Sequence, residues 1–217
     1  MLFKVLLNII ITPFGFKLDY IKSMLFGRTH GLYPLPWMNY HAINYINRST
    51  ENFSRVFEYG SGSSTLYWVG RGAKIVSIEH EPSFFNKLKM QLDRNAVYLL
   101  IEPQIETQGE INSPDNPDLY QSSGNVGYNF ENYVKAIDVY PDAHFDIVIV
   151  DGRARPSCIK RAIAKIKSGG MLVLDNSDRK YYTQQTSSLL NDWSFIIFRG
   201  TVRGLAHQEQ TTIYVKP

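Results

Sequence analysis

Residues 56–65, VFEYGSGSST, decide the fold that this sequence predicts. A strand-like run from Arg55 to Glu58 passes into a glycine- and serine-rich turn, at which a helix is expected to begin. Gly60 and Gly62 allow the backbone to turn sharply and let a ligand approach without an intervening Cβ. The stretch therefore predicts a strand, a ligand-binding turn and a helix; the alternative is a tight turn with only a structural role.

Strands and helices alternate along the rest of the chain. We expect strands at 74–79, 95–101, 145–150 and 171–174, and a closing hairpin from strands at 193–198 and 211–215. We expect helices at 37–46, from Pro82, at 129–139, at 156–167 with Gly169 as its C-terminal stop, and at 181–190. Because crossovers between parallel strands are right-handed, this order predicts a doubly wound α/β fold. The expected sheet is Rossmann-like, mostly parallel and seven-stranded, with an antiparallel C-terminal hairpin.

Acidic side chains stand where several expected strands end. These are Glu58, Glu79, Asp151 and Asp175, the last of which is followed by the amide Asn176. They share one crevice if the strand order reverses at the first strand, since ligands bind there in open α/β sheets. Glu79 follows Gly60 by nineteen residues, a position from which a carboxylate can accept hydrogen bonds from both hydroxyls of a ribose. The alternative is that Glu79 is a solvated strand end.

Thr65 replaces the third glycine of the dinucleotide-binding fingerprint. That glycine lets the helix pack closely on the strand, so its absence argues against a bound pyrophosphate and a nucleotide-dependent oxidoreductase.

The motifs VFEYGSGSST, IVSIEHEP, FDIVIVDG and GGMLVLDN follow one another in this order. Through them, residues 36–217 resemble class I S-adenosylmethionine-dependent methyltransferases, among them small bacterial methyltransferase-domain proteins. The resemblance implies that Glu58, Gly60, Ser61 and Gly62 hold the methionine part of S-adenosylmethionine. It also implies that Glu79 binds the ribose and that His80 lies near the adenine.

Asp151, Asp175 and Asn176 offer hard oxygen ligands suited to Mg²⁺, which would orient and acidify an acceptor hydroxyl. This set is similar to that of the catechol and caffeoyl-coenzyme A O-methyltransferases, and it makes Asp151 the candidate catalytic residue. The run GRAR at 152–155 lacks the lysine that those enzymes use as a base. The alternative is that Asp151 contacts the cofactor amine and the pair Asp175-Asn176 caps the following turn.

The expected reaction is O-methylation of a sugar or another small hydroxylated metabolite. A non-catalytic module that binds the cofactor or a partner on the same fold is the alternative. Three arginines near the expected strand ends favour an anionic acceptor: Arg153, Arg155 and Arg179. The alternative is that they are ordinary surface charges. The loop at 102–128 is expected to shape acceptor binding. The alternative is that it is a flexible insertion with no role in binding. Aromatic residues that could roof the pocket, unless they pack in the core, are Trp37, Tyr40, Tyr128 and Tyr133.

Composition places the chain of 217 residues, 44% hydrophobic and 20% charged, among ordinary globular proteins. Its net charge of +3 is not gathered into a basic run, which argues against a nucleic-acid partner. The single cysteine, Cys158, excludes an internal disulfide, favours the cytoplasm and is expected in the core.

Residues 1–35 are expected to form an apolar leader and cap, and residues 36–217 the methyltransferase domain. The apolar stretch within residues 1–13 is too short to span a bilayer. It is expected to pack on the domain or, alternatively, to lie on a membrane at the cytoplasmic face with Lys4, Lys17 and Lys22 toward the headgroups.

Overall fold

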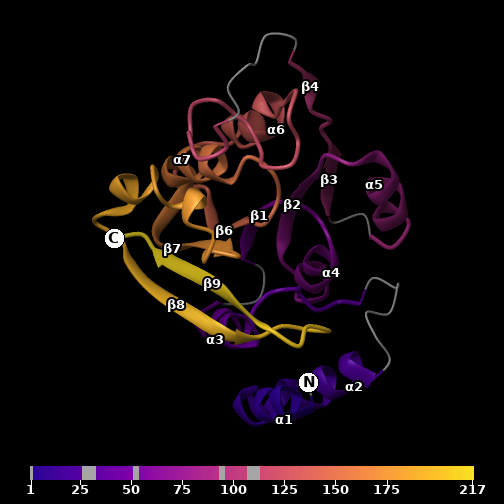
Figure 1. Ribbon diagram of the computed structural model, residues 1–217. Coiled ribbons are helices and arrows are strands. Elements are labelled where there is room, and N and C mark those ends of the chain that lie inside the picture. Colours follow the sequence, from indigo (N-terminus) through magenta and orange to yellow (C-terminus); the bar gives the residue numbers. More distant parts are fainter. Residues whose placement is uncertain (1, 26–32, 51–53, 93–95, 107–112) are drawn as a thin grey trace.

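A computed structural model describes residues 2–25, 33–50, 54–92, 96–106 and 113–217. Its centre is a seven-stranded sheet in the order β3-β2-β1-β6-β7-β9-β8 (Figure 1). The strands are β1 (Arg55–Tyr59), β2 (Lys74–Glu79), β3 (Val97–Leu100), β6 (Phe145–Val150), β7 (Ile166–Asp175), β8 (Ser194–Thr201) and β9 (Gln208–Val215). The first five strands in this order are parallel, and β9 runs antiparallel to both β7 and β8. The predicted fold class is confirmed, and the strand order reverses at β1.

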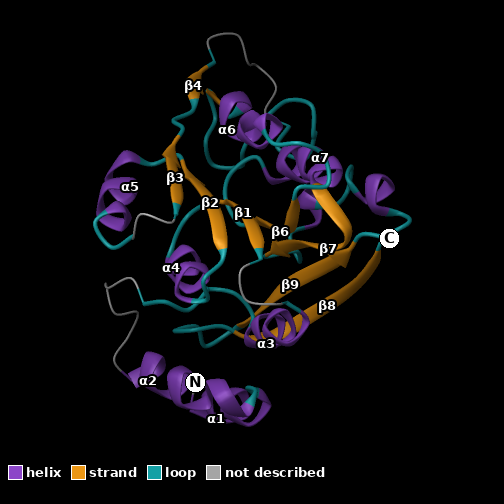
Figure 2. Ribbon diagram, turned by 180° about the vertical axis from the view of Figure 1, so that it is seen from behind, coloured by secondary structure: helices purple, strands orange, loops and turns teal. Residues whose placement is uncertain are grey.

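Helices cover both faces of the sheet (Figure 1; Figure 2). One face carries α3 (Tyr40–Ser49) and α4 (Ser63–Gly70), and the opposite face carries α6 (Glu131–Lys135) and α7 (Arg155–Lys165). The helix α5 (Pro82–Lys89) packs on β2 and β3 at one end of the sheet. The central strand β6 is buried on both sides, which explains its unbroken apolar sequence.

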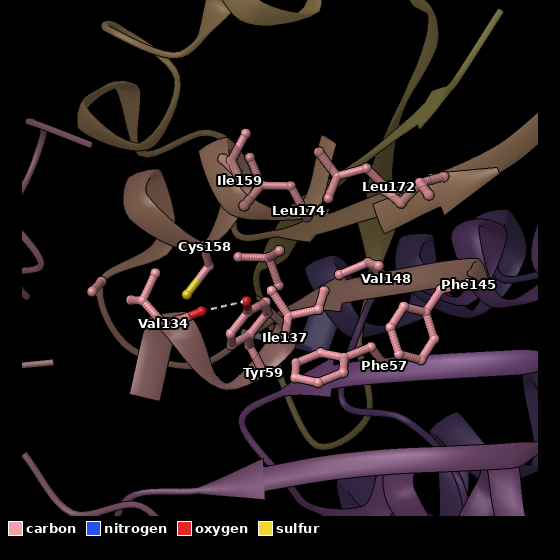
Figure 3. Close-up of a cluster of buried hydrophobic side chains, with 14 of the residues drawn as sticks. Phe57, Tyr59, Val134, Ile137, Phe145, Val148, Cys158, Ile159, Leu172 and Leu174 are labelled. Atoms are coloured by element: carbon pink, nitrogen blue, oxygen red, sulfur yellow. Dashed lines mark hydrogen bonds between the residues drawn. The ribbon is translucent and has the colours of Figure 1, made fainter. Parts of the chain in front are cut away.

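The core on the α6–α7 side is built from aromatic and branched side chains (Figure 3). Tyr59, at the end of β1, donates a hydrogen bond from its hydroxyl to the carbonyl of Val134 in α6 (2.8 Å), and Figure 3 shows this bond beside Cys158. Cys158 is fully buried, as the sequence predicted. The bond fixes α6 against the strand that leads into the glycine-rich turn at 60–62.

The helix predicted at 156–167 ends earlier than expected, at Lys165, and Gly169 is not its stop. The carbonyls of the last turn find partners elsewhere in the chain: the N–H groups of Ala143 and His144 donate to Ala164 and Lys165. A glycine cap is therefore unnecessary. The strand β7 begins at once at Ile166 and contains Gly169, whose φ is +75°.

The helix predicted at 181–190 is wrong. The structure has two separate 3₁₀ turns there, Lys180–Tyr182 and Ser187–Leu190. Thr183 and Thr186 donate side-chain hydrogen bonds to the carbonyls of Lys180 and Tyr182. Such local bonds compete with regular helix formation.

The long loop is closed at its base by a small ribbon. Strand β4 (Gln104–Ile105) pairs with β5 (Tyr128–Asn129), and 107–112 lie outside the described residues. The helix predicted at 129–139 is divided into α6 and a 3₁₀ turn, Ala136–Val139. The strand predicted at 95–101 is shorter, and Asn95 lies outside the described residues.

The N-terminal segment forms α1 (Leu2–Ile11), a 3₁₀ turn (Phe14–Phe16) and α2 (Lys17–Leu25). Both helices lie against α3 and the β8–β9 hairpin (Figure 1). The expected packing on the domain is confirmed for residues 2–25, whereas the division at residue 35 stays a prediction. Within the described parts of the chain, no helix has the length and apolar character needed to cross a membrane.

Candidate active site

The turn after β1 meets the end of β6 through two glycines. Gly60 has a φ of +90°, and a Cβ there would lie 2.7 Å from the Cα of Gly152. A Cβ on Gly152 would in turn collide with the hydroxyl of Tyr133. Only glycines allow this approach, which brings the ends of β1 and β6 together.

Glu58 is fully buried beneath the turn and does not face an open cleft. Its Oε2 accepts hydrogen bonds from the hydroxyls of Thr65 (2.5 Å) and Ser77 (2.6 Å). The Thr65 hydroxyl also accepts a bond from the N–H of Gly62 (3.0 Å). Glu58 therefore holds the shape of the turn through Thr65, a residue for which the sequence had indicated no positive role.

Gly62 leaves open space at the start of α4. Its φ of 173° is extended backbone that any residue can adopt, so the conformation does not require glycine. A Cβ at this position would meet only the hydroxyl oxygen of Ser64, at 3.9 Å. Apart from the chain neighbours of Gly62, no other described atom lies within 4 Å of that Cβ, so a ligand can approach the backbone there.

Glu79, at the end of β2, lies next to this turn and is almost fully buried. Its Oε2 accepts a hydrogen bond from the Ser61 hydroxyl (2.7 Å), which also contacts the Tyr98 hydroxyl (2.7 Å). Burial alone would raise the pKa of Glu79, but hydrogen bonds from His80 and Ser61 outweigh it and leave the pKa below its ordinary value. The carboxylate stays ionised and can accept bonds from ligand hydroxyls.

His80 links the ends of β2 and β6. Its Nε2 accepts a hydrogen bond from the Arg153 guanidinium (3.1 Å), and its Nδ1 lies 2.8 Å from Glu79 Oε1. Since Nε2 is an acceptor, the neutral ring carries its proton on Nδ1, facing the carboxylate. Arg153 is thus engaged within the protein.

A cavity of about 210 Å³ opens at the ends of β6 and β7. Three of its lining residues are Asp151, Asp175 and Asn176, which the structure therefore brings together as expected. Glu58 and Glu79 are not in its lining and stand at the neighbouring turn. The other lining residues are Trp37, Val202, Arg203, Leu205 and Glu209.

Arg155, at the start of α7, binds neighbouring groups of the protein and does not offer a free binding site for an anion. Its guanidinium donates to the carbonyls of Asp151, Gly152 and Asp175, and to Asp151 Oδ1 (2.8 Å). It also lies over the ring of Tyr182, 4.8 Å from the centroid. Arg155 therefore fixes the relative position of the β6 and β7 ends.

The two aspartates of the cavity have raised pKa values. Burial raises the pKa of Asp175 well above its ordinary value, and the nearby Asp151 adds to the shift. Burial also raises the pKa of Asp151, against the opposing effect of Arg155. Both groups hold a proton to higher pH than exposed aspartates do.

The fit of this cavity to Mg²⁺ is poor in two respects. Asp151 Oδ1 accepts from Arg155, and Asp175 Oδ1 accepts from Thr211 (2.6 Å). Carboxylate and amide oxygens are suitable ligands for Mg²⁺, but here the carboxylates of Asp151 and Asp175 already accept hydrogen bonds from Arg155 and Thr211.

Sequence reasoning missed the contribution of the β8–β9 connection. Val202, Arg203 and Leu205 of this connection line the cavity together with Glu209 of β9, whereas none of the described residues of the 102–128 loop does. Trp37 lines it as expected, but Tyr40 and Tyr133 are buried core residues and Tyr128 belongs to β5. No motif within residues 202–209 indicates a binding site, because these residues reach the cavity only through the pairing of β9 with β7.

Solved structures share this fold. A methyltransferase-like protein from Silicibacter pomeroyi is 19% identical, with a TM-score of 0.56 over 86% of this chain and 91% of that one. An O-methyltransferase from Bacillus cereus, solved in complex with SAH, is 13% identical, with a TM-score of 0.53 over 80% of this chain and 78% of that one. The O-methyltransferase TomG from Streptomyces achromogenes, solved in complex with SAM, is 16% identical, with a TM-score of 0.51 over 80% and 77%.

No family model matches the chain, and no curated protein matches it significantly. The fold is that of the S-adenosylmethionine-dependent methyltransferases.

Proposed function

We propose that the protein is an S-adenosylmethionine-dependent methyltransferase that methylates a hydroxyl group of a sugar or another small hydroxylated metabolite. The observation that carries the proposal is the open space at Gly62 in a turn whose Ser61 hydroxyl donates a hydrogen bond to the ionised carboxylate of Glu79. Both lie at the point where the strand order reverses, the ligand-binding position of open α/β sheets. The SAM and SAH complexes of proteins with this fold support the same cofactor.

Different residues of the chain bind different parts of this cofactor. Gly60, Ser61 and Gly62 present backbone to its methionine part, and Glu58 keeps that turn in shape through Thr65. Glu79 accepts hydrogen bonds from the ribose hydroxyls, and His80 is positioned beside it for the adenine. The cofactor supplies an electrophilic methyl group on a sulfonium.

The cavity at the ends of β6 and β7 holds the acceptor. Its carboxylates and the Asn176 amide can accept hydrogen bonds from hydroxyl groups, and Trp37 offers an apolar surface for a sugar ring. Asp151 is the catalytic residue: its carboxylate would take the proton of the acceptor hydroxyl when the methyl group passes to the acceptor oxygen, so that the S–CH3 bond of the sulfonium breaks as the O–CH3 bond forms and the neutral thioether leaves. Its side chain is 30% exposed, so a substrate can reach it. A raised pKa makes Asp151 a stronger base than an exposed aspartate.

A metal ion is not required by this scheme. The Mg²⁺ site at Asp151, Asp175 and Asn176 stays a prediction, and the hydrogen bonds from Arg155 and Thr211 favour activity without it. The cytoplasmic location and the absence of a nucleic-acid partner also stay predictions.

The cofactor proposal is tested by thermal unfolding with S-adenosylhomocysteine. At ~100 times its dissociation constant, a ligand of the native state adds about 2.7 kcal/mol of stability. Gly62→Ala should weaken binding roughly tenfold or more, because the new methyl group occupies ligand space. Gly70→Ala, at the end of α4, is the matched control, since a Cβ there meets nothing within 4 Å. A folded protein whose unfolding is unaffected by the ligand would refute the proposal.

The acceptor proposal is tested by transfer of a labelled methyl group to a panel of sugars and small hydroxylated compounds. Asp151→Asn should bind S-adenosylhomocysteine yet lose transfer, and excess EDTA should leave the wild-type rate unchanged. Loss of transfer in EDTA, restored by Mg²⁺, would establish the metal site instead. Cofactor binding without transfer to any compound of the panel, or to those of a cell extract, would identify a non-catalytic module.

A further inference from the structure

The N-terminal helices expose apolar side chains on the side that faces away from the sheet. Phe14 is 91% exposed, Leu25 73% and Ile10 70%. We call this surface the outer apolar face. It consists of Leu6, Leu7, Ile10, Ile11, Phe14, Leu18 and Leu25, each of them exposed.

The inner side of the same helices is held by polar contacts. Asn8 donates to the Tyr20 hydroxyl (3.0 Å) and to the carbonyl of Ala206 (3.2 Å). The hydroxyls of Thr12 and Thr201 are 2.7 Å apart, and both side chains are buried. Turning α1 over would bury its apolar residues only by breaking these buried hydrogen bonds, which is costly. The outward orientation of the apolar residues is therefore the stable one.

The charged residues of this segment are arranged for an anionic surface. Residues 2–25 contain three lysines, Lys4, Lys17 and Lys22, and one acidic residue, Asp19. Asp19 is turned inward, where it accepts a hydrogen bond from the Tyr40 hydroxyl (2.6 Å) and lies 3.6 Å from Arg203. Lys4 and Lys22 are exposed on the same two helices that carry the outer apolar face. An apolar strip with lysines and no outward carboxylate is the pattern of helices that lie in a membrane interface.

We propose that the outer apolar face docks on a lipid membrane that contains anionic lipids, with α1 and α2 lying along its surface. A second copy of the chain is a poorer occupant, because a symmetric contact would bring the lysines of both copies together. The α1 helix has ten residues, so it lies on the membrane and does not cross it.

Docking in this way would connect the membrane-bound helices to the cavity that, under the proposed function, holds the acceptor. The Tyr20 hydroxyl donates to the carbonyl of Leu205 (3.1 Å), and the Ser23 hydroxyl accepts from the N–H of Gly204 (3.0 Å). Leu205 and the neighbouring Arg203 line the cavity. The helices that meet the lipid are thus bonded directly to the loop that borders the acceptor.

The test is flotation of the full chain with vesicles of phosphatidylcholine alone or mixed with phosphatidylglycerol. We expect binding to the mixed vesicles, and at least a tenfold loss in the variant Ile10→Gln/Phe14→Gln/Leu18→Gln. The matched control, Met90→Gln/Ile105→Gln/Val139→Gln, removes equally exposed apolar side chains from other elements and should bind as the wild type does. Lys4→Gln and Lys22→Gln should each weaken binding to the mixed vesicles about fivefold.

Failure of the wild-type chain to float with the mixed vesicles would overturn the proposal, as would equal flotation of both triple variants. Dimers in analytical ultracentrifugation that only the first triple variant dissociates, without vesicle binding, would assign the face to self-association. S-adenosylhomocysteine binding is measured on the same variants and should not change, which separates this proposal from the proposed function.

Discussion

Glu58 is an ionisable group held wholly out of water at the centre of the sheet. Burial raises the pKa of Glu58 to about 7, although hydrogen bonds from neighbouring hydroxyls oppose the shift. In an unfolded chain a glutamate titrates near ~4.3. Between these two values the folded state binds more protons than the unfolded state. The contribution of Glu58 to stability is therefore complete below the unfolded pKa and is lost as the pH rises through about 7.

Glu58→Gln removes this titration while keeping an acceptor for the Thr65 hydroxyl. From pH 5 to pH 8, the free energy of unfolding of the wild-type protein should fall by about 2–3 kcal/mol more than that of the variant. Urea denaturation of both proteins at the two pH values measures the difference. Parallel pH dependence in the two proteins would show that the Glu58 carboxyl does not titrate in this range.

At the scale of elements, Arg155 joins the first turn of α7 to the ends of β6 and β7. A lysine at this position keeps the charge but cannot reach three carbonyls and a carboxylate in the plane of a guanidinium. Arg155→Lys should lower the free energy of unfolding by about 2–4 kcal/mol, because buried acceptors lose their donors.

Arg161→Lys, on the same helix, is the control for this change. Arg161 is partly exposed and lies 3.5 Å from Asp138, so its replacement should cost about 0–1 kcal/mol. Urea denaturation compares the two variants. Equal effects at both positions would mean that Arg155 is an ordinary surface cation.

At the scale of the whole molecule, the two cores lie on opposite faces of one sheet and share its strands. Val148 faces the core that contains Trp193, whereas Ile149, the next residue, faces the core that contains Trp68. Because β6 belongs to both cores, neither can unfold while the other stays intact.

Val148→Ala should therefore lower the midpoint of denaturation by the same amount whichever face of the sheet is monitored. Removing the two buried methyl groups of the valine should lower the free energy of unfolding by about 1–3 kcal/mol. Fluorescence of the variant, recorded in backgrounds that carry Trp37→Phe together with either Trp193→Phe or Trp68→Phe, reports each face separately, because each protein then keeps a single tryptophan. A midpoint shift confined to the Trp193 side would contradict a single cooperative unit.

The sequence by itself determined the alternation of strands and helices, the glycine turn at 60–62 and the acidic strand ends. These features depend on local periodicity and on backbone freedom at particular residues, both of which are written in neighbouring positions. The burial of the FDIVIV strand on both faces followed from the same kind of pattern.

Only the tertiary structure decided where the helix after β6 ends, because its last carbonyls are bound by Ala143 and His144 from before β6. Only the fold showed that Thr65 connects Glu58 to the turn and that Arg155 clamps two strand ends. The pairing of β9 with β7 carries residues 202–209 to Asp151, across a long separation in sequence. Contacts of this kind depend on which distant segments pack together, and no pattern among adjacent residues encodes them.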